Sequence, residues 1–265
     1  MNRDRTLIVA SMERTGSTYL CRLLKSTGVA GEPDEYLNDW WILTKGPGFG
    51  IRTCKVLSLP KVAGYGLGLL KTPGGYADVA PSGVPRYLHA IEKAHRSPNG
   101  VFALKLHWKH FAFATGSWGL DFPPAGPDVT WVHLWREDRF AQAVSWLRAL
   151  QTNHWNTEDP SIGEPVYDSV RLGHLVRQAI AAKDRWDRHF ETFENPPLEL
   201  TYEYLNSDPV GVVDQVLEML GEKTTVVPEV SIMVQRDRLN QEWMERMVKD
   251  HPDLVDLRYA PPVAG

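Results

Sequence analysis

Short apolar runs alternate with helical patterns along most of the chain. Runs of four to seven residues, mostly apolar and rich in β-branched or aromatic side chains, predict buried strands at residues 7–10, 101–106, 129–135 and 198–201. Apolar residues at helical spacing predict helices at residues 19–24, 85–95, 138–150, 165–193 and 208–220. Strands that alternate with helices indicate an α/β fold, in which a parallel sheet is flanked by helices on both faces.

Residues 44–86 interrupt this pattern. Nine glycines and five prolines crowd the segment, so we expect a long irregular region with a short strand at residues 54–57. Long loops inside compact domains often form lids or substrate loops, and this one is expected to shape a substrate pocket. No change of composition marks a domain boundary, so residues 1–265 are predicted to form a single domain.

The charge balance excludes one class of function and leaves another open. The 265 residues carry a net charge of −4, so no overall basic field exists to hold a nucleic-acid backbone. A local basic pocket for a small anion is compatible with this charge. The chain has two cysteines and shows no signal peptide or membrane span, which predicts a cytoplasmic protein without a disulfide framework.

A loop of small and hydroxyl-bearing residues follows the first predicted strand and precedes a helix. Its sequence is Arg14-Thr15-Gly16-Ser17-Thr18. Backbone N–H groups at a helix N-terminus, together with the helix dipole, favour a phosphate or sulfate. The glycine permits close approach of the backbone, the hydroxyls donate, and the arginine offers a fork of donors. The alternative is an ordinary strand-to-helix turn with capping hydroxyls.

A nucleoside-triphosphate loop is not indicated, because the lysine and the first glycine of that motif are missing. The third predicted strand ends in His133-Leu134-Trp135 and shows no clear Walker-B pattern for a carboxylate that holds magnesium, which counts against a kinase. Arg136 follows that strand instead, and Ser145 lies nine residues later in the next helix. Alone they could be a solvated arginine and a surface serine, but with the first loop they indicate a second anion contact.

The two segments resemble the sulfotransferases that use 3′-phosphoadenosine 5′-phosphosulfate (PAPS). More narrowly, the chain is similar to the bacterial trehalose 2-sulfotransferase family. The segments that carry this likeness are residues 14–18, 27–36, 97–101, 105–108, 142–152 and 213–221. The resemblance implies a P-loop-like PAPS sulfotransferase fold, PAPS as donor with the 3′,5′-bisphosphate PAP as product, no metal, and a homodimer. It also implies that residues 14–18 hold the 5′-phosphosulfate and that Arg136 and Ser145 hold the 3′-phosphate.

The same resemblance assigns the acceptor chemistry to residues after the first helix. Glu35 is expected to be the general base, and Glu32 and Tyr36 are expected to contact the acceptor, a carbohydrate or another small hydroxyl compound. Partial burial near an anion would raise the pKa of Glu35 and make it a better base near neutrality. A solvated acidic turn is the alternative for these carboxylates.

Four further residues are candidates on chemical grounds. Lys105, at the end of a predicted strand, could point a cation into the same cleft or reach solvent. His107 is the rival base, and its pairing with His110 does not complete a convincing set of metal ligands. Trp108 and Trp155 are predicted to contact the acceptor, because aromatic faces suit sugar rings.

Glu13 departs from the pattern of the resembled family, whose loops generally carry proline or a neutral residue there. A carboxylate beside a phosphosulfate would repel it unless the side chain were turned away or paired. This leaves open a nucleotide-binding protein of the same fold without transfer activity. A small-molecule kinase is the third and most distant alternative.

Overall fold

The computed structural model describes residues 4–49, 83–123, 126–155, 161–226 and 238–259. The strand predicted at residues 54–57 and most of the glycine- and proline-rich region lie outside these residues.

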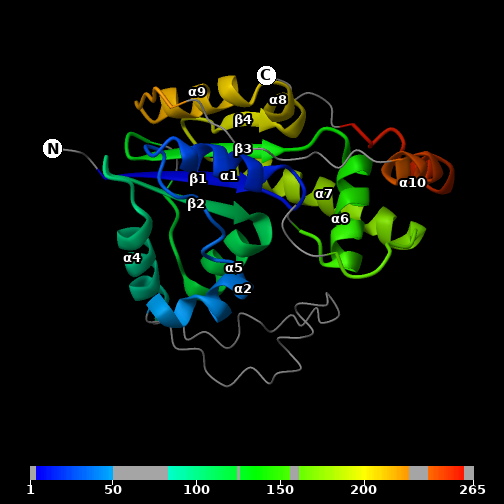
Figure 1. The fold of residues 1–265 in the computed structure, drawn as a ribbon, viewed down its shortest axis with the longest axis horizontal. Helices are drawn as coiled ribbons and strands as arrows, with labels where there is room; N and C mark the ends of the chain where they lie inside the picture. Colours follow the sequence, from blue (N-terminus) through cyan, green and yellow to red (C-terminus); the bar gives the residue numbers. More distant parts are fainter. Residues whose placement is uncertain (1–3, 50–82, 124–125, 156–160, 227–237, 260–265) are drawn as a thin grey trace.

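A sheet of parallel strands lies at the centre of the described chain (Figure 1). Its strands are β1 (Arg5–Ser11), β2 (Val101–His107), β3 (Val129–Trp135) and β4 (Leu198–Thr201). They are ordered β2-β1-β3-β4, and each neighbouring pair is parallel. The predicted parallel sheet is therefore confirmed. Because the strands share one direction, their carboxyl ends meet at one edge, where open α/β sheets bind ligands.

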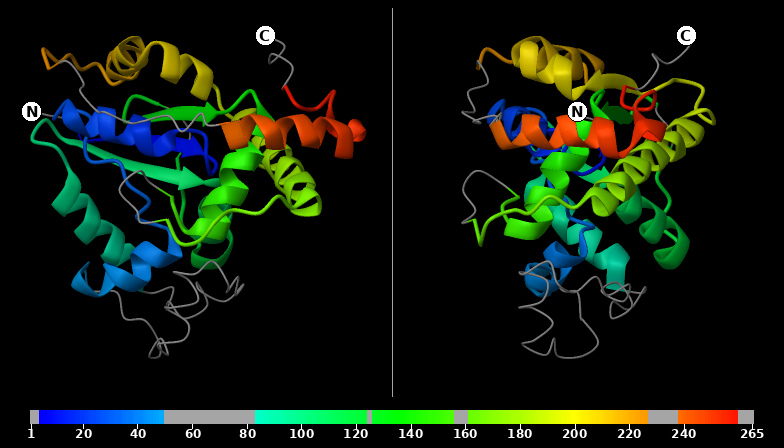
Figure 2. Two further views of the ribbon diagram at one scale, coloured as in Figure 1. Left: turned by 45° about the vertical axis from the view of Figure 1, so that its right-hand side comes forward. Right: turned by 90° about the vertical axis from the view of Figure 1, so that its right-hand side faces the viewer.

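Helices cover both faces of this sheet, as predicted (Figure 2). They are α1 (Ser17–Ser26), α2 (Asp39–Thr44), α4 (Val84–His95), α5 (Trp108–Trp118), α6 (Arg139–Thr152), α7 (Ser169–Phe190), α8 (Tyr202–Ser207), α9 (Pro209–Met219) and α10 (Arg238–Asp250), with 3-10 turns at Gly46–Phe49 and Pro252–Leu254. Apolar side chains of α1 and α9 pack on one face, and those of α4, α5 and α7 pack on the other. A third cluster joins α6, α7 and α10.

Alternation along β2 decides which of its side chains face α1. Val101 and Ala103 pack in the cluster that contains the leucines of α1. Side chains two residues apart share a face of a strand, so Lys105 and His107 point to that same side at the carboxyl end of β2. Both are nearly inaccessible to solvent, with exposures of 4% and 5%. The strand thus directs a lysine and a histidine toward the beginning of α1.

Sequence patterning did not predict α2, α5, α8 and α10. Of these helices, α5 and α8 follow directly after strands. The predicted cap Asp138 is confirmed, since its side chain accepts hydrogen bonds from the N–H groups of Phe140 and Ala141. The long helix is shorter than predicted: it begins at Ser169, where Asp168 caps it, and ends at Phe190. Strong helix caps, rather than the apolar pattern, therefore set these boundaries.

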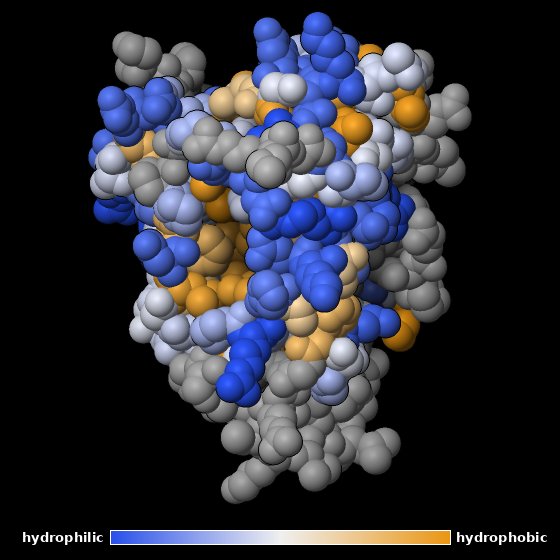
Figure 3. All heavy atoms as spheres, turned by 90° about the vertical axis from the view of Figure 1, so that its left-hand side faces the viewer, coloured by the Kyte–Doolittle hydropathy of each residue, from blue (hydrophilic) through white to orange (hydrophobic). Residues whose placement is uncertain are grey.

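The face at the amino ends of the strands presents mostly hydrophilic side chains around an apolar hollow (Figure 3). Ion pairs lie at this end of the fold, among them Arg5 with Glu222 and Lys25 with Glu32. The pair of Lys25 with Glu32 is exposed, and such pairs contribute little stability each. The chemistry that the sequence indicates lies at the opposite edge.

Gly31 allows the segment after α1 to run against the backbone of β2. Its φ is +74°, and a Cβ there would lie 2.9 Å from the backbone nitrogen of Ala103 and from the carbonyl oxygen of Val101. We expect Gly31→Ala to lower the free energy of unfolding by more than about 2 kcal/mol, because strain and a backbone clash add. Gly28→Ala is the matched control: φ is +71° with nothing within 4 Å, so a smaller loss is expected. Urea unfolding of both variants measures the difference, and equal losses would contradict the clash.

Candidate functional site

The loop before α1 provides no side chain that caps the start of the helix. Gly16 is the N-cap of α1 with a φ of +80°, and no side chain caps the helix there. A Cβ at Gly16 would lie 2.7 Å from the ring of Tyr202, so glycine is required. Thr15 donates its hydroxyl to the carbonyl oxygen of Met12 at 2.9 Å and is 1% exposed, so its side chain supports the turn. All of the predicted loop residues except Thr15 line a cavity.

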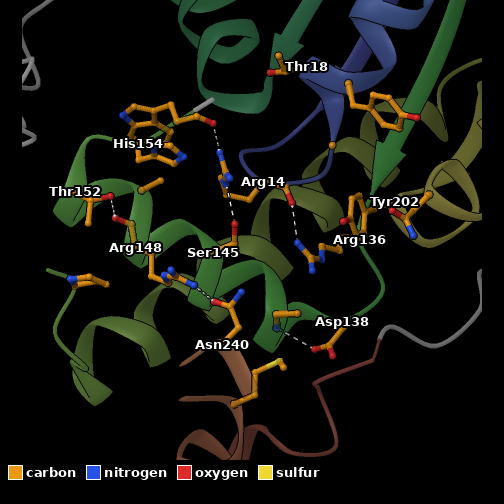
Figure 4. A pocket seen from close by; sticks show the side chains of 18 of the residues that line it. Arg14, Thr18, Arg136, Asp138, Ser145, Arg148, Thr152, His154, Tyr202 and Asn240 are labelled. Atoms are coloured by element: carbon orange, nitrogen blue, oxygen red, sulfur yellow. Dashed lines mark hydrogen bonds between the residues drawn. The ribbon is translucent and has the colours of Figure 1, made fainter. Parts of the chain in front are cut away.

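This cavity has a volume of about 1050 Å³ and lies at the carboxyl edge of the sheet (Figure 4). Its walls come from the loop before α1, from α1 and α6, from the start of α8, and from α10. The basic residues on the walls are Arg14, Arg22, Arg136, Arg148, Arg238 and His154. Such a set of guanidinium groups is suited to an anion with several charges.

Arg14 crosses the cavity rather than facing solvent (Figure 4). Its Nε donates to the hydroxyl of Ser145 at 2.9 Å, and its Nη1 donates to the carbonyl oxygen of Trp155 at 2.6 Å. The backbone of Arg14 has a φ of +64°, which is uncommon for residues other than glycine. Three residues predicted from separate segments therefore meet here. Trp155, predicted to contact the acceptor, lies instead in the wall that contains Arg14.

Arg136 lies on the other side of the same cavity. Its guanidinium carbon lies 4.3 Å from the centre of the Tyr202 ring, and its Nη1 donates to the carbonyl oxygen of Arg14 at 3.4 Å. Its Nε lies 3.9 Å from a carboxylate oxygen of Glu203. The ring face and the carboxylate orient the guanidinium, which leaves it beside the loop that contains Arg14.

Glu35 lies in a buried polar cluster next to this cavity. Its Oε1 accepts from Nζ of Lys105 at 2.7 Å and lies 3.2 Å from Nε2 of His107. Its Oε2 accepts from the amide of Asn38 at 2.5 Å. Nζ of Lys105 also donates to the hydroxyl of Thr18 at 3.1 Å. The lysine therefore joins the carboxylate to the start of α1 and is buried, which excludes the alternative that it reaches solvent.

The electrostatics of Glu35 reverse one expectation from the sequence. Burial alone would raise its pKa, but Lys105 and His107 lower the pKa of this carboxyl well below its ordinary value. The predicted raised pKa is therefore wrong for this structure. His107 contacts Ser11 on its other side, with Nδ1 and the hydroxyl oxygen 3.1 Å apart. This contact fixes the orientation of the ring toward the carboxylate.

Glu13 is paired and does not repel an anion in the loop. Its Oε1 accepts from Nζ of Lys109 at 2.5 Å. Burial alone would raise its pKa, but Lys109 and His107 lower the pKa from 4.5 to about 2. Its backbone carbonyl oxygen accepts from the side chain of Gln142 at 2.8 Å. These contacts fasten the loop to α5 and α6.

The low pKa of Glu13 predicts a pH-dependent contribution to stability. A carboxyl whose pKa is lower in the folded chain stabilises the fold above its unfolded pKa and loses this contribution as pH falls. We expect Glu13→Gln to destabilise the protein at pH 7, and the difference from wild type to shrink between pH 4.5 and about 2. Urea unfolding of both proteins across this range measures the difference. A difference that does not vary with pH would contradict the ion pair.

Two predicted acceptor residues lie apart from the cluster. Glu32 is 42% exposed and pairs with Lys25 at 2.7 Å and with His95 at 3.3 Å, toward the amino edge of the sheet. The side chain of Tyr36 is 1% exposed in the apolar core and donates to the carbonyl oxygen of Glu32 at 2.5 Å. The structure therefore argues against acceptor contacts by either side chain. Side chains in the segment 32–36 range from buried to exposed. That of Glu35 contacts Lys105 near the carboxyl end of β2.

Trp108 begins α5 directly after His107 and is half-buried. Its ring packs edge-on against that of Trp186, with centres 5.0 Å apart. Trp155 is also half-buried but lines the cavity, whereas Trp108 directly follows His107 of the Glu35 cluster in the chain.

Several cavity residues were not predicted from the sequence. Arg148 lies about one turn after Ser145 on α6, and its Nη1 donates to the side-chain oxygen of Asn240 on α10 at 2.6 Å. Helical spacing from Ser145 could have indicated Arg148. Asn240 and Tyr202 follow strands or loops distant in sequence, so no local signal indicated them.

One group of described residues could hold a metal ion by spacing: His133, Asp187 and Glu199. Their contacts already satisfy them, because His133 Nδ1 lies 2.8 Å from Glu199 and both oxygens of Asp187 accept from Lys183. His107 and His110 are not part of such a group among the described residues. Within the same residues, no helix combines the length and the apolar character of a membrane span.

The arginine-lined cavity at the start of α1 agrees with the anion site that the sequence motifs predict. Comparison with known sequences decides the family. The profile of the Stf0 sulphotransferases matches residues 6–250. The chain belongs to the Stf0 sulphotransferase family. It is therefore a sulfotransferase, as the sequence predicted.

Two relatives of this sulfotransferase are similar over almost their whole length. The trehalose 2-sulfotransferase of Mycolicibacterium smegmatis is 29% identical over 259 residues, which cover 92% of this chain and 94% of the relative. The trehalose 2-sulfotransferase of Mycobacterium tuberculosis is 26% identical over 276 residues, covering 94% and 97%.

Solved structures of sulfotransferases are more distant. A sulfotransferase from Mycobacterium avium aligns with a TM-score of 0.47 and 16% identity, covering 94% of this chain and 69% of that one. A sulfotransferase from Alicyclobacillus acidocaldarius aligns with a TM-score of 0.45 and 16% identity, covering 100% and 99%. The family assignment rests on the sequence match.

Proposed function

We propose that this sulfotransferase moves a sulfuryl group from PAPS to a hydroxyl of a small carbohydrate of the trehalose type. One observation carries the proposal: Lys105 joins Glu35 to Thr18, so a candidate base lies directly beside an arginine-lined cavity. We propose that residues 1–265 act as one sulfotransferase domain.

The cavity supports PAPS as donor. Ser17 and Thr18 offer backbone N–H groups at the uncapped start of α1, where a phosphosulfate is favoured by the helix dipole. Arg136 and Ser145 lie where they could hold a 3′-phosphate at the other side. Arg14 lies between these two places and could contact both anionic groups. The volume of about 1050 Å³ accommodates a nucleotide of this size.

Glu35 is proposed to take the proton of the acceptor hydroxyl. As this O–H bond breaks, the acceptor oxygen forms a bond to sulfur, and the bond between sulfur and the bridging phosphate oxygen breaks. The leaving phosphate gains the negative charge. Arg14, Lys105 and the N–H groups of the loop could stabilise this charge, which is the largest demand of such a transfer.

The acceptor class is proposed from the relatives and from the side chains near Glu35. Both named relatives are trehalose 2-sulfotransferases. Trp108 directly follows His107, is half-buried and could pack against a sugar ring. His107 could hold an acceptor hydroxyl, since it already contacts Glu35.

A transfer assay with labelled PAPS tests the proposal. We expect label to move to trehalose in the presence of the purified chain, and PAP to raise the melting temperature more than ADP does. Glucose and sucrose serve as acceptors of related chemistry. Binding of PAP without transfer to any disaccharide would contradict the acceptor, and stabilisation by ATP instead of PAP would contradict the donor.

A further inference from the structure

Lys105 contacts two groups that belong to different halves of the proposed reaction. Its Nζ lies 2.7 Å from Oε1 of Glu35 and donates to the hydroxyl of Thr18 at 3.1 Å. Thr18 lines the cavity proposed for the donor, whereas Glu35 is not among the described residues that line it. Lys105 itself is 4% exposed. The ammonium therefore forms a buried connection between donor cavity and candidate base.

The carboxylate of Glu35 is the anionic group in direct contact with the ammonium of Lys105. The carboxylate also accepts from Asn38 at 2.5 Å and lies 3.2 Å from Nε2 of His107. Lys105, Asn38 and His107 thus surround the carboxylate with polar hydrogen-bonding groups. A carboxylate with this many donors is a weak base, because its proton must displace them. An acceptor hydroxyl that donates to Glu35 would have to displace one of these contacts.

A donor at the start of α1 changes the balance of charge around Lys105. A phosphosulfate brings several negative charges to the N–H groups of Ser17 and Thr18. An ammonium has three donors and no fixed fork, so it can turn from one oxygen to another with a small movement. The flexible stem of Lys105 already reaches Thr18. The donor oxygens would then compete with Glu35 for the same cation.

We propose that Lys105 couples donor binding to the base: it holds Glu35 while the cavity is empty and turns to the phosphosulfate at Thr18 when the donor binds. The inference rests on the proposed function. Its consequence is an order of events, in which Glu35 is released to accept a proton only when the 5′-phosphate end of the nucleotide occupies the start of α1. Lys105 then contacts the donor, and the loss of its contact with Glu35 leaves that carboxylate able to take a proton.

The groups that face this cluster come from four segments. Those that influence the pKa of Glu35, Lys105 or His110 are Cys21, Asp34, Lys109 and Glu13, besides the cluster itself. Glu35 and Cys21 keep the pKa of Lys105 raised despite its burial, so the lysine stays charged at neutral pH. Asp34 lies in the same segment as Glu35, and Glu13 is occupied by Lys109. Lys105 is thus the cation that can exchange partners.

Carbon-13 NMR titration of the Glu35 carboxyl, in the free full-length protein and with saturating PAP, tests this coupling. In wild type we expect PAP to raise the pKa of Glu35 by at least about one unit, a tenfold change in proton affinity. In Lys105→Met the pKa is expected to be raised already without PAP, and PAP to add less than half of the wild-type rise. Lys109→Met removes a nearby cation that pairs with Glu13 and is expected to keep the full rise.

A second measurement uses the wild type alone. The Lys105 side-chain signal is expected to follow the titration of Glu35 in the free protein and to lose this dependence with PAP bound. PAP binding without a rise in the pKa of Glu35, or an equal rise in Lys105→Met, would overturn the coupling while leaving the proposed donor intact. Failure of the wild type to bind PAP would overturn the proposed donor and the coupling with it.

Discussion

Glu35→Gln is expected to slow sulfuryl transfer by about 10²-fold or more while leaving PAP binding intact. Glutamine keeps the shape of the side chain and can still contact Lys105 and Asn38, but it cannot take the proton of a hydroxyl. An aliphatic hydroxyl is a poor nucleophile while it keeps that proton, and loss of a positioned base typically costs about 10²–10⁴-fold in rate. Steady-state kinetics with PAPS and trehalose, beside PAP titration calorimetry, measure both properties.

Glu32→Gln is the matched control for this variant. Glu32 lies three residues earlier in the same segment but pairs with Lys25 and His95 toward the amino edge. We expect its turnover number and acceptor KM to stay near wild type. If Glu35→Gln turned over normally while His107→Ala did not, the base would be His107 instead.

Arg136→Ala is expected to weaken PAP binding by roughly ten- to a hundredfold and to change ADP binding little. A hydrogen bond to a charged group contributes about 1.5–3 kcal/mol, and ADP lacks the 3′-phosphate that Arg136 is proposed to hold. Tyr202 and Glu203 orient the guanidinium toward the cavity before any ligand arrives, so little ordering entropy opposes the contact.

Arg177→Ala provides the control for charge alone, because Arg177 lies on α7 and pairs with Asp253 at the surface. Titration calorimetry of both variants with PAP and ADP separates the two effects. Equal losses for both nucleotides in Arg136→Ala would show that the residue does not read the 3′-phosphate.

The part of the site nearest the strands could be predicted from the sequence. Arg14 and Arg136 follow β1 and β3, which are neighbours in the sheet, and parallel strands bring their carboxyl ends to one edge. The helix that starts after β3 then carries Ser145 to Arg14. Strand order was not known beforehand, yet any parallel order would have left these loops on the same edge.

The partners of Glu35 could not be predicted in the same way. The segment after α1 contacts β2 through a hydrogen bond from Lys105 to the carbonyl oxygen of Asp34, a pairing between residues about 70 positions apart. No local pattern indicates such a contact. The sequence therefore suggested a partly desolvated carboxylate with a raised pKa, whereas Lys105 and His107 beside it lower that pKa.

The helix α5 was missed for a different reason. Its residues Trp108–Trp118 include four Trp and Phe side chains besides His110, which favour strands as readily as helices, and Gly116 lowers the helical preference. Packing against β2 and α7 decides the outcome. Tertiary contacts therefore override local preference in this segment.

The contact between Arg148 and Asn240 has a consequence for synthesis of the chain on the ribosome. Asn240, Met244 and Tyr259 contribute to walls whose other residues begin at Arg14, so the cavity is assembled from early and late parts of the chain. A nascent chain that has not yet reached α10 lacks these walls. The nucleotide proposed for this cavity would therefore contact all of its walls only once α10 has been made, and would stabilise the completed fold most.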